Sequence, residues 1–351
     1  MLTDPRLNRS LLYAADAPPV SQIPNLIDEP GLLNLDGPEH QRLRSTVQKA
    51  LAPRAIARWR PWVTSVVDQL VDGLVTAGPQ VDAIASFTRP LPIEVICRLL
   101  NLDGLDPERL RHWSSHAFSA TAYSAEEVQA GMREFGAFVA ARMAEHRGHP
   151  GDDLTGCLTR AAQESDQVSE AELVMLVLHL VLAGYETTAT ALGNALVFLL
   201  DQRPESWEII GQDEAAAASA VEQMLRMIPL GEVTTTPGML RRAAEDLDIG
   251  GVRIPAGSVV AANTAIANRD PDVYPDSLGQ DLFAPVEAPS LTFGAGPHYC
   301  PGASLTRMEM EVALHRLARR LPTMRLAVST EEISWHQGEL LRSPATLPVV
   351  W

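Results

Sequence analysis

The sequence predicts a mainly α-helical fold with a small β portion, on two observations. Apolar residues recur at three- and four-residue spacing over long stretches, the pattern of helices with one buried face. Strand signals, by contrast, are few and fall late in the chain. The stretches with helical periodicity are residues 42–52, 55–77, 126–145, 169–200, 215–226 and 303–321.

The longest of these helices, 169–200, is expected to run through the centre of the molecule. Ser169 with Glu172 three residues later is the pattern of a capping box, which starts a helix. The segment 184–188 (Gly-Tyr-Glu-Thr-Thr) interrupts the apolar run, leaving pieces too short to cross a bilayer. We therefore expect a buried helix of a soluble protein and no association with a membrane.

The β portion is expected near the C-terminal end. Residues 247–255 read as a hairpin that turns at Gly250-Gly251, followed by a strand at 258–260, and residues 347–351 suit a last short strand. Residues 266–291 are rich in Pro, Asp and Asn, which indicates a long ordered meander rather than a linker.

Bulk properties limit the possible functions. The 351 residues contain no linker composition and no repeat, so we expect one domain over 1–351. A net charge of −16 argues against binding to nucleic acid, which requires a basic surface. Three scattered cysteines and an N-terminus without a secretory pattern predict a reducing, cytoplasmic location.

The segment 293–302 (Phe-Gly-Ala-Gly-Pro-His-Tyr-Cys-Pro-Gly) carries the strongest chemical signal. It places Cys300 in a glycine-rich turn directly before a helical pattern. Glycines permit tight backbone paths, and a helix start directs its free N–H groups toward a negative sulfur. The alternative is a buried structural cysteine, which suits Cys97 and Cys157 better. We read Cys300 as a protected thiolate that binds a metal.

Four collinear segments together resemble a bacterial cytochrome P450, a soluble haem-thiolate monooxygenase. They are 40–44 (His-Gln-Arg-Leu-Arg), 183–188 (Ala-Gly-Tyr-Glu-Thr-Thr), 268–271 (Asn-Arg-Asp-Pro) and the cysteine segment 293–302. The likeness runs from about Asp4 to Trp351, and the cysteine segment is its specific element. The resemblance implies the cytochrome P450 fold and haem b (iron protoporphyrin IX) as cofactor.

The resemblance also implies roles around the haem plane. Cys300 would be the axial ligand, a thiolate that donates electron density to the iron. Phe293 would pack on the ligand side and Gly294 would give the loop its tight path. Ala183 and Gly184 would be small enough for the central helix to pass close over the cofactor.

An acid–alcohol pair lies in the same helix. By the resemblance, Thr187 would hold bound oxygen and Glu186 would relay protons from solvent, which oxygen activation requires. The alternative is that Thr187 and Thr188 bond back to carbonyls four residues earlier and only bend the helix. We expect Thr188 to be structural.

Cations should bind the two haem propionates. His40 and Arg44 lie one helical turn apart and so share a face. For Arg42 and Arg242 we expect solvated surface charges, although the neighbours Arg241 and Arg242 are ambiguous in register. The expected propionate ligands are His40, Arg44, Arg241 and His298.

The sequence departs from the family pattern in a supporting network. The family has Glu-x-x-Arg paired with a second arginine in the meander, but here Gln223 precedes Arg226 and Gly279 stands at the second arginine's place. Glu222 could partly substitute by reaching Arg226 along its helix. We expect the haem to be retained but held less firmly than usual.

A second departure concerns the start of the chain. Relatives usually have further residues before position 2, which form a first helix and the leading strands of a sheet. Two readings are open: the start of the sequence is truncated or misassigned, or the fold lacks the usual N-terminal helix and leading strands, which would leave one sheet edge unpaired.

The function expected from the resemblance is O2-dependent hydroxylation, epoxidation or oxidative coupling of a small organic substrate in natural-product metabolism. Without a dinucleotide-binding glycine motif, the chain should receive electrons from a ferredoxin or flavodoxin with an NAD(P)H-dependent reductase. Docking is expected near the thiolate face, although an ordinary solvated helix face is the alternative; its positive residues are Arg307, Arg316, Arg319 and Arg320. Two other functions are open: an inactive helper protein that binds a partner enzyme, and a peroxygenase, which the acid–alcohol pair disfavours.

Overall fold

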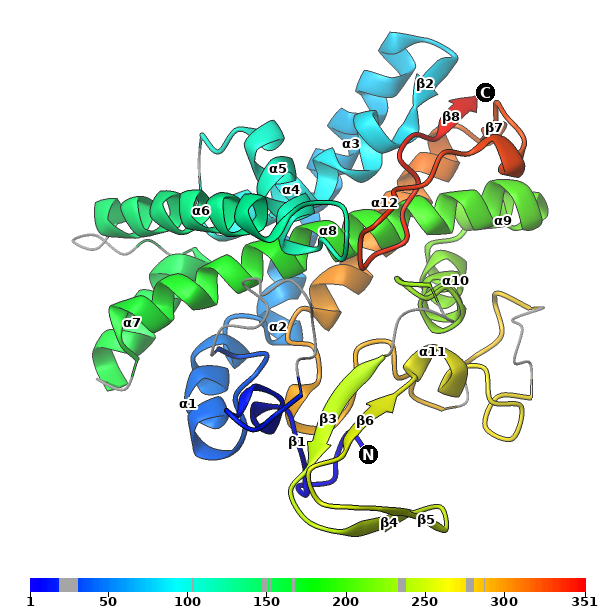
Figure 1. The fold of residues 1–351 in the computed structure, drawn as a ribbon. Coiled ribbons are helices and arrows are strands. Elements are labelled where there is room, and N and C mark those ends of the chain that lie inside the picture. Colours follow the sequence, from blue (N-terminus) through cyan, green and yellow to red (C-terminus); the bar gives the residue numbers. More distant parts are fainter. Residues whose placement is uncertain are drawn as a thin grey trace.

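The computed structural model describes residues 1–18, 31–102, 104–146, 151, 153–165, 168–232, 238–275, 281–286 and 288–351. Most of these residues are helical, and the strands are short (Figure 1). The helices are α1 (Gly37–Gln48), α2 (Pro53–Ile56), α3 (Arg60–Ala77), α4 (Pro90–Leu99), α5 (Pro107–Ala117), α6 (Ala125–His146), α7 (Leu154–Ser165), α8 (Glu170–Gln202), α9 (Pro204–Gln212), α10 (Glu214–Met227), α11 (Thr264–Ala267) and α12 (Ala303–Arg320). The mainly α fold class is confirmed.

All six stretches with helical periodicity contain helices. The expected helix over 55–77 is divided into α2, a short 3-10 turn and α3, because Pro53 and Pro61 each stand in a first helical turn and start a new helix. The capping box of α8 is present: the Glu172 amide donates to the Ser169 hydroxyl at 3.2 Å, and the Ser169 amide donates to the Glu172 carboxylate at 2.8 Å.

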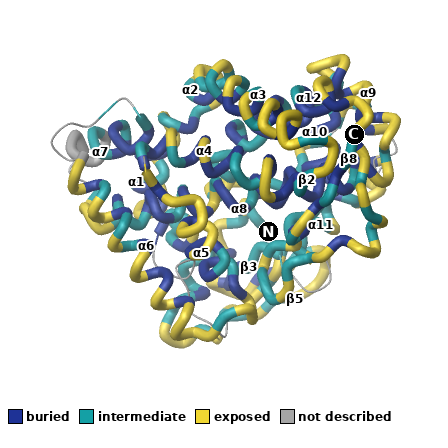
Figure 2. The backbone as a smooth tube through the Cα atoms, turned by 90° about the horizontal axis from the view of Figure 1, so that it is seen from above, coloured by how far each residue is buried: buried dark blue, intermediate teal, exposed yellow. Residues whose placement is uncertain are grey.

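Helix α8 forms the centre of the molecule, with α4, α6 and α12 packed around it (Figures 1 and 2). Among the described residues it is the one helix long and apolar enough to cross a membrane, yet 67% of its apolar window is buried inside the protein. That burial is typical of the core helix of a soluble protein. Helix α12, which follows the cysteine segment, packs on α3, α9 and α10.

The strands form small antiparallel sheets in the described part of the chain. They are β1 (Leu7–Asn8), β2 (Gln80–Asp82), β3 (Met239–Ala243), β4 (Leu247–Ile249), β5 (Val252–Ile254), β6 (Val259–Ala262), β7 (Arg325–Leu326) and β8 (Pro348–Val350). Their orders are β1-β3-β6, β2-β8-β7 and β4-β5. In the first of these sheets β1 and β6 are the edge strands. Leu7 and Asn8 of β1 pair with Ala243 and Arg242 of β3.

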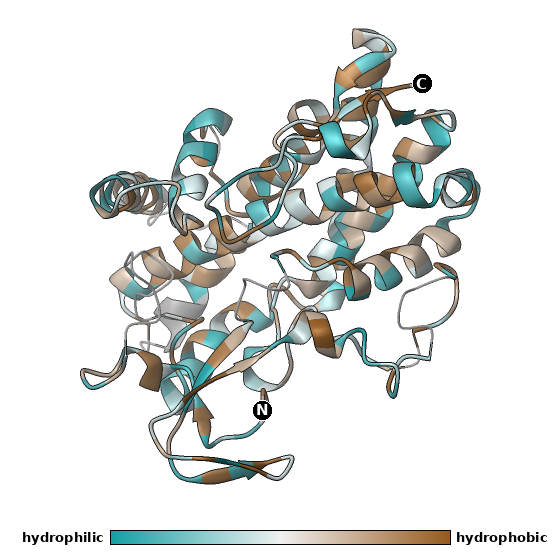
Figure 3. Cartoon of the chain, turned by 45° about the vertical axis from the view of Figure 1, so that its right-hand side comes forward, coloured by the Kyte–Doolittle hydropathy of each residue, from teal (hydrophilic) through white to brown (hydrophobic). Residues whose placement is uncertain are grey.

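The predicted hairpin and last strand are confirmed. The β4–β5 hairpin projects from the helical body (Figures 1 and 3), and it turns at Gly250 (φ 59°) and Gly251 (φ 80°). Positive φ at both turn positions matches the right-handed twist of a hairpin. The last strand, β8, pairs with both β2 and β7.

Candidate active site

Cys300 lies in the loop that leads into α12 and is half-buried. Its backbone amide donates to the Phe293 carbonyl at 2.8 Å, which closes the loop into a ring-like turn. Burial raises the pKa of the Cys300 thiol, whereas the backbone N–H groups of Gly302 and Ala303 lower it by bonding to the sulfur. The start of α12 therefore directs N–H groups at the sulfur, as the sequence predicted.

The glycines of this loop adopt the conformations that make them necessary. Gly294 and Gly296 have φ values of 73° and 70°, a region that other residues rarely occupy. A Cβ at Gly296 would lie 3.1 Å from the Thr3 side chain, so this glycine also permits close contact with the N-terminal segment. Phe293 is buried beneath the loop, with the Arg307 guanidinium 4.5 Å from its ring centre.

On α8, Ala183 and Thr187 lie one helical turn apart and both retain solvent exposure in the middle of an otherwise buried helix. The Thr187 hydroxyl donates to the Ala183 carbonyl at 2.6 Å, the back-bond that the structural alternative foresaw. Because that bond uses only the proton, the oxygen lone pairs of Thr187 can still accept from a ligand. Thr188 is buried beside Thr306 and is structural, as expected.

Gly184 has a different neighbour from the one expected. A Cβ at this position would lie 2.8 Å from the terminal methyl of Ile96, so the glycine allows α8 to pack against α4. The prediction that Gly184 faces the cofactor is thus corrected, because it is turned about 100° from Ala183 around the helix axis. Of the two small residues, Ala183 faces the open side.

Glu186 is 8% exposed and points toward α5, where the Ser114 hydroxyl donates to its carboxylate at 2.8 Å. Burial raises the pKa of Glu186, while the Ser114 hydrogen bond and the charges of Arg89 and Arg111 lower it. A buried carboxyl with a raised pKa keeps its proton to a higher pH than an exposed one and can pass that proton to a neighbour.

The predicted propionate ligands come together from distant parts of the chain. The His40 and His298 rings lie 4.3 Å apart, and His298 Nε2 is 3.0 Å from the Asp36 carboxylate. His40 is 2% exposed, its Nε2 has no hydrogen-bond partner among the described residues, and burial lowers its pKa to about 4. Arg44 lies near Cys300, and burial lowers its pKa.

The ambiguity between Arg241 and Arg242 is resolved by β3, which turns them to opposite faces. Arg242 forms an ion pair with Asp16 at 2.8 Å, so it is neither a propionate candidate nor the solvated charge we expected. Arg241 is 2% exposed and donates to the Leu240 carbonyl. Burial, followed by the charge of Arg9, lowers its pKa to about 10.

Sequence reasoning missed Arg9. Arg9 directly follows β1, whose Asn8 is opposite Arg242, and the charge of Arg9 acts on Arg241. Its Nη2 donates to Asn34 at 3.0 Å, but its buried Nε has no partner in the described part of the chain. No motif marks Arg9; only the pairing of β1 with β3, which brings the start of the chain beside Arg241, reveals it.

These basic residues fit the anionic propionate edge of a haem. His40, Arg9 and Arg241 carry buried donors, and the described residues give them few carboxylates, which is costly unless a ligand supplies the anions. The haem propionates are such a ligand, and the Cys300 sulfur is a ligand for its iron. The residues present therefore fit a haem-thiolate cofactor.

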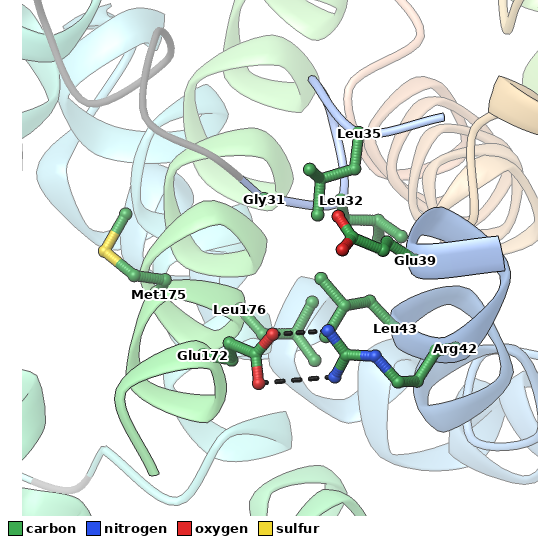
Figure 4. A pocket seen from close by; sticks show the side chains of 9 residues that line it. All are labelled: Gly31, Leu32, Leu35, Glu39, Arg42, Leu43, Glu172, Met175 and Leu176. Atoms are coloured by element: carbon green, nitrogen blue, oxygen red, sulfur yellow. Dashed lines mark hydrogen bonds and ion pairs between the residues drawn. The ribbon is translucent and has the colours of Figure 1, made fainter. Parts of the chain in front are cut away.

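Arg42, on the same helix as His40, has a structural role. It forms an ion pair with Glu172 across a small pocket of about 170 Å³ between α1 and α8 (Figure 4). Because Glu172 also caps α8, one carboxylate fixes the start of the central helix and anchors α1 to it. Arg42 is thus not the solvated charge we expected.

The altered network around Gln223 is intact in a different form. Gln223 Oε1 accepts from Arg226 at 3.1 and 2.9 Å, and Arg226 Nη1 donates to the Asn268 carbonyl. Glu222 does not take the role we suggested, because its carboxylate is paired with Arg307. Gly279 lies outside the described residues.

The expected docking face is less positive than its sequence suggested. Arg307 is paired with Glu222, Arg316 with Asp68 and Arg320 with Asp72. Within the described ranges, Arg319 alone of the four has no ion-pair partner, so carboxylates offset most of this charge.

Comparisons with known proteins show the family of the chain. The family model for "Cytochrome P450" matches residues 217–323. The chain is 37% identical over its full length to nocardicin C N-oxygenase of Nocardia uniformis subsp. tsuyamanensis, covering 86% of that protein. It is 40% identical over 92% of its length to the mycinamicin IV hydroxylase/epoxidase of Micromonospora griseorubida, covering 80% of it.

A solved structure gives the same result for the fold. The crystal structure of a cytochrome P450 with biaryl coupling reactivity superposes with a TM-score of 0.89 at 31% identity, over 100% of this chain and 87% of that one. Full-length coverage at more than 30% identity shows the family as well as the fold. The chain belongs to the cytochrome P450 family and is a bacterial-type monooxygenase of that family.

Proposed function

We propose that this protein uses haem b and O2 to hydroxylate, epoxidise or oxidatively couple a small organic substrate in secondary metabolism. The observation that carries the proposal is the convergence of Cys300, in a glycine loop, with the basic residues His40, Arg44 and Arg241, none of which is ion-paired with a carboxylate of the described residues. A thiolate beside basic side chains without carboxylate partners suits a haem better than a metal held by protein ligands alone. In the described residues no group of three or more His, Cys, Asp or Glu could hold a metal ion.

Each residue has a separate part in holding the cofactor. Cys300 would bind the iron, with Phe293 packed behind it and Gly294 shaping the loop. His40, Arg44, His298, Arg241 and Arg9 would bind the propionates. A haem bound there supplies an iron centre at which O2 is reduced with electrons from outside the chain.

Glu186 and Thr187 of α8 would deliver protons on the haem face opposite Cys300. Thr187 keeps its lone pairs free because its proton goes to the Ala183 carbonyl, so it can accept a hydrogen bond from a protonated ligand. Glu186 would carry a proton toward that ligand, and Ser114 holds its carboxylate in place. Ala183 leaves room for a small ligand on this face.

The partners and location remain part of the proposal. We infer that electrons arrive from a ferredoxin or flavodoxin, because the chain has no dinucleotide-binding glycine motif of its own. Three free cysteines suit a cytoplasmic enzyme. The Gln223–Arg226 contact gives the helper-protein reading less support than the sequence suggested.

The test is turnover with isotopic oxygen. Purified holoenzyme is supplied with a surrogate ferredoxin, its reductase and NADPH under 18O2, with mycinamicin IV and a phenolic compound as probes. We expect substrate-type spectral shifts or product carrying 18O, and none with Cys300→Ala. A haem-containing protein that consumes no O2 under these conditions would contradict the proposal.

A further inference from the structure

A second buried carboxyl lies close to Glu186 and has no part in the mechanism above. Glu339 belongs to the turn after β7, and its side chain is 9% exposed. Its neighbours Gly338 and Leu340 are bonded to the end of α5 and the loop after it: the Leu340 amide donates to the Phe118 carbonyl at 2.9 Å, and the Ala120 amide donates to the Gly338 carbonyl at 2.8 Å. These bonds fix the turn against the end of α5, the helix whose Ser114 hydroxyl donates to Glu186.

His336 and Arg89 form a basic pair beside Glu339. Arg89 Nη2 lies 2.7 Å from His336 Nε2, and since a guanidinium can only donate, Nε2 must accept. His336 is then neutral, with its proton on Nδ1, which faces the Glu339 carboxylate at 3.6 Å. Burial and the charges of Arg89 and Arg111 lower the pKa of His336, which agrees with the neutral ring.

Arg89 also borders a space large enough to hold water. With Arg111 and Tyr185 it lines a cavity of about 720 Å³ between α4 and α5. Tyr185 is fully buried, and its hydroxyl has no hydrogen-bond partner among the described residues. A roomy cavity with a guanidinium and an orphan hydroxyl on its wall is suited to hold ordered water. Water held in this cavity would contact Tyr185, whose neighbour along α8 is Glu186.

We propose that Glu339, positioned by His336 and Arg89, is a second proton-carrying carboxyl that resupplies Glu186 during oxygen reduction. This inference rests on the proposed function, in which Glu186 releases protons toward bound oxygen. Protonated Glu339 gives its proton, through water, to the Glu186 carboxylate and is then reprotonated from solvent. Only protons move; the electrons are those of the monooxygenase reaction.

The charges around Glu339 suit this role. The groups facing it are His336 of its own turn, Arg89 before α4 and Glu186 of α8, while Arg111 of α5 acts on Glu186 and His336. Burial and the Glu186 charge raise the pKa of Glu339 to about 7, against the opposing effect of Arg89. A carboxyl that titrates near neutral pH both holds and releases protons under working conditions.

The test measures what becomes of O2 when electrons are supplied without an organic substrate. The holoenzyme receives electrons from a surrogate ferredoxin, and the peroxide formed per O2 consumed is compared for wild type, Glu339→Gln and Glu339→Asp. We expect Glu339→Gln to raise the peroxide fraction several-fold and to flatten its pH dependence near pH 7, and Glu339→Asp to restore it in part. Glu94→Gln, an exposed carboxylate on the rim of the same cavity, should behave as wild type.

Two controls separate this inference from the proposed function. In Glu186→Gln the further change Glu339→Gln should add little, because the two residues act in series. The resting protein is also titrated by infrared difference spectroscopy, which needs no turnover: a protonated carboxyl signal near neutral pH should vanish in Glu339→Gln. An unchanged infrared signal, or a wild-type peroxide fraction in Glu339→Gln, overturns the role of Glu339 even if the enzyme is active.

Discussion

Gln223 and Arg226 form a buried pair in which one amide oxygen accepts two hydrogen bonds from the guanidinium, at 3.1 and 2.9 Å. The Gln223 amide nitrogen donates to the Ala284 carbonyl at 3.0 Å, so the side chain joins α10 to the meander. The uncharged glutamine thus uses a donor that a carboxylate lacks. The network is rearranged rather than lost.

Replacing Gln223 should therefore show the value of this donor. Gln223→Ala should lower the free energy of unfolding by about 2–4 kcal/mol, because it leaves the Arg226 guanidinium underbonded in the interior. Gln223→Glu should also destabilise, but by less, since it keeps Arg226 bonded and sets an oxygen against the Ala284 carbonyl. Urea unfolding of the three proteins checks both values; a Gln223→Glu protein more stable than wild type would contradict the interpretation.

Arg9 should slow the loss of haem. Its partnerless Nε and its proximity to Arg241 predict that Arg9→Ala increases the rate of haem transfer to apomyoglobin several-fold. Arg6→Ala is the matched control, because Arg6 is exposed and paired with Asp4. Equal transfer rates for the two variants would remove Arg9 from the cofactor site.

The Thr187 hydroxyl should matter for coupling rather than for folding. Its bond to the Ala183 carbonyl stabilises little, so Thr187→Val should unfold within about 1 kcal/mol of wild type. The same change should raise peroxide formation several-fold during NADPH oxidation, while Thr187→Ser should not. Thr188→Val, at the buried neighbour, should leave peroxide formation unchanged, and an equal effect at both threonines would contradict the assignment.

Glu339 should make the stability of the protein fall as the pH rises. Its pKa is raised from 4.5 to about 7 in the folded state, so the unfolded chain binds fewer protons between these values and stability decreases across that interval. The shift corresponds to at most about 3 kcal/mol. The melting temperature of Glu339→Gln should therefore increase relative to that of wild type between pH 5 and pH 8. A constant difference between the two melting temperatures would show that Glu339 does not titrate in this range.

Much of the fold and site could be predicted from local sequence. The periodic helices, the capping box at Ser169, the Gly250-Gly251 turn and the Cys300 loop depend on residues close together in the chain, so their patterns are visible there. The partners that arise from packing were not visible. Arg9 comes near Arg241 because β1 pairs with β3, and Gly184 faces Ile96 because of the packing of α8 on α4.

The misjudged charges have the same explanation. Arg42, Arg242 and Glu222 find their partners 130, 226 and 85 residues away, at distances along the chain that no local pattern encodes. The helix spacing that suggested Glu222 for Arg226 was sound, but Arg307 of α12 lies closer in the fold. Local chemistry predicted the reactive residues better than their supporting ion pairs.

The most direct test of the whole account is the absorption spectrum of the purified, reduced protein under carbon monoxide. We predict the red-shifted Soret band of a thiolate-ligated haem in wild type and its loss in Cys300→Ala. In that variant the haem should still be bound through its propionates. The same thiolate band in Cys300→Ala, or no haem absorbance in wild type, would contradict the assignment of Cys300 as the iron ligand.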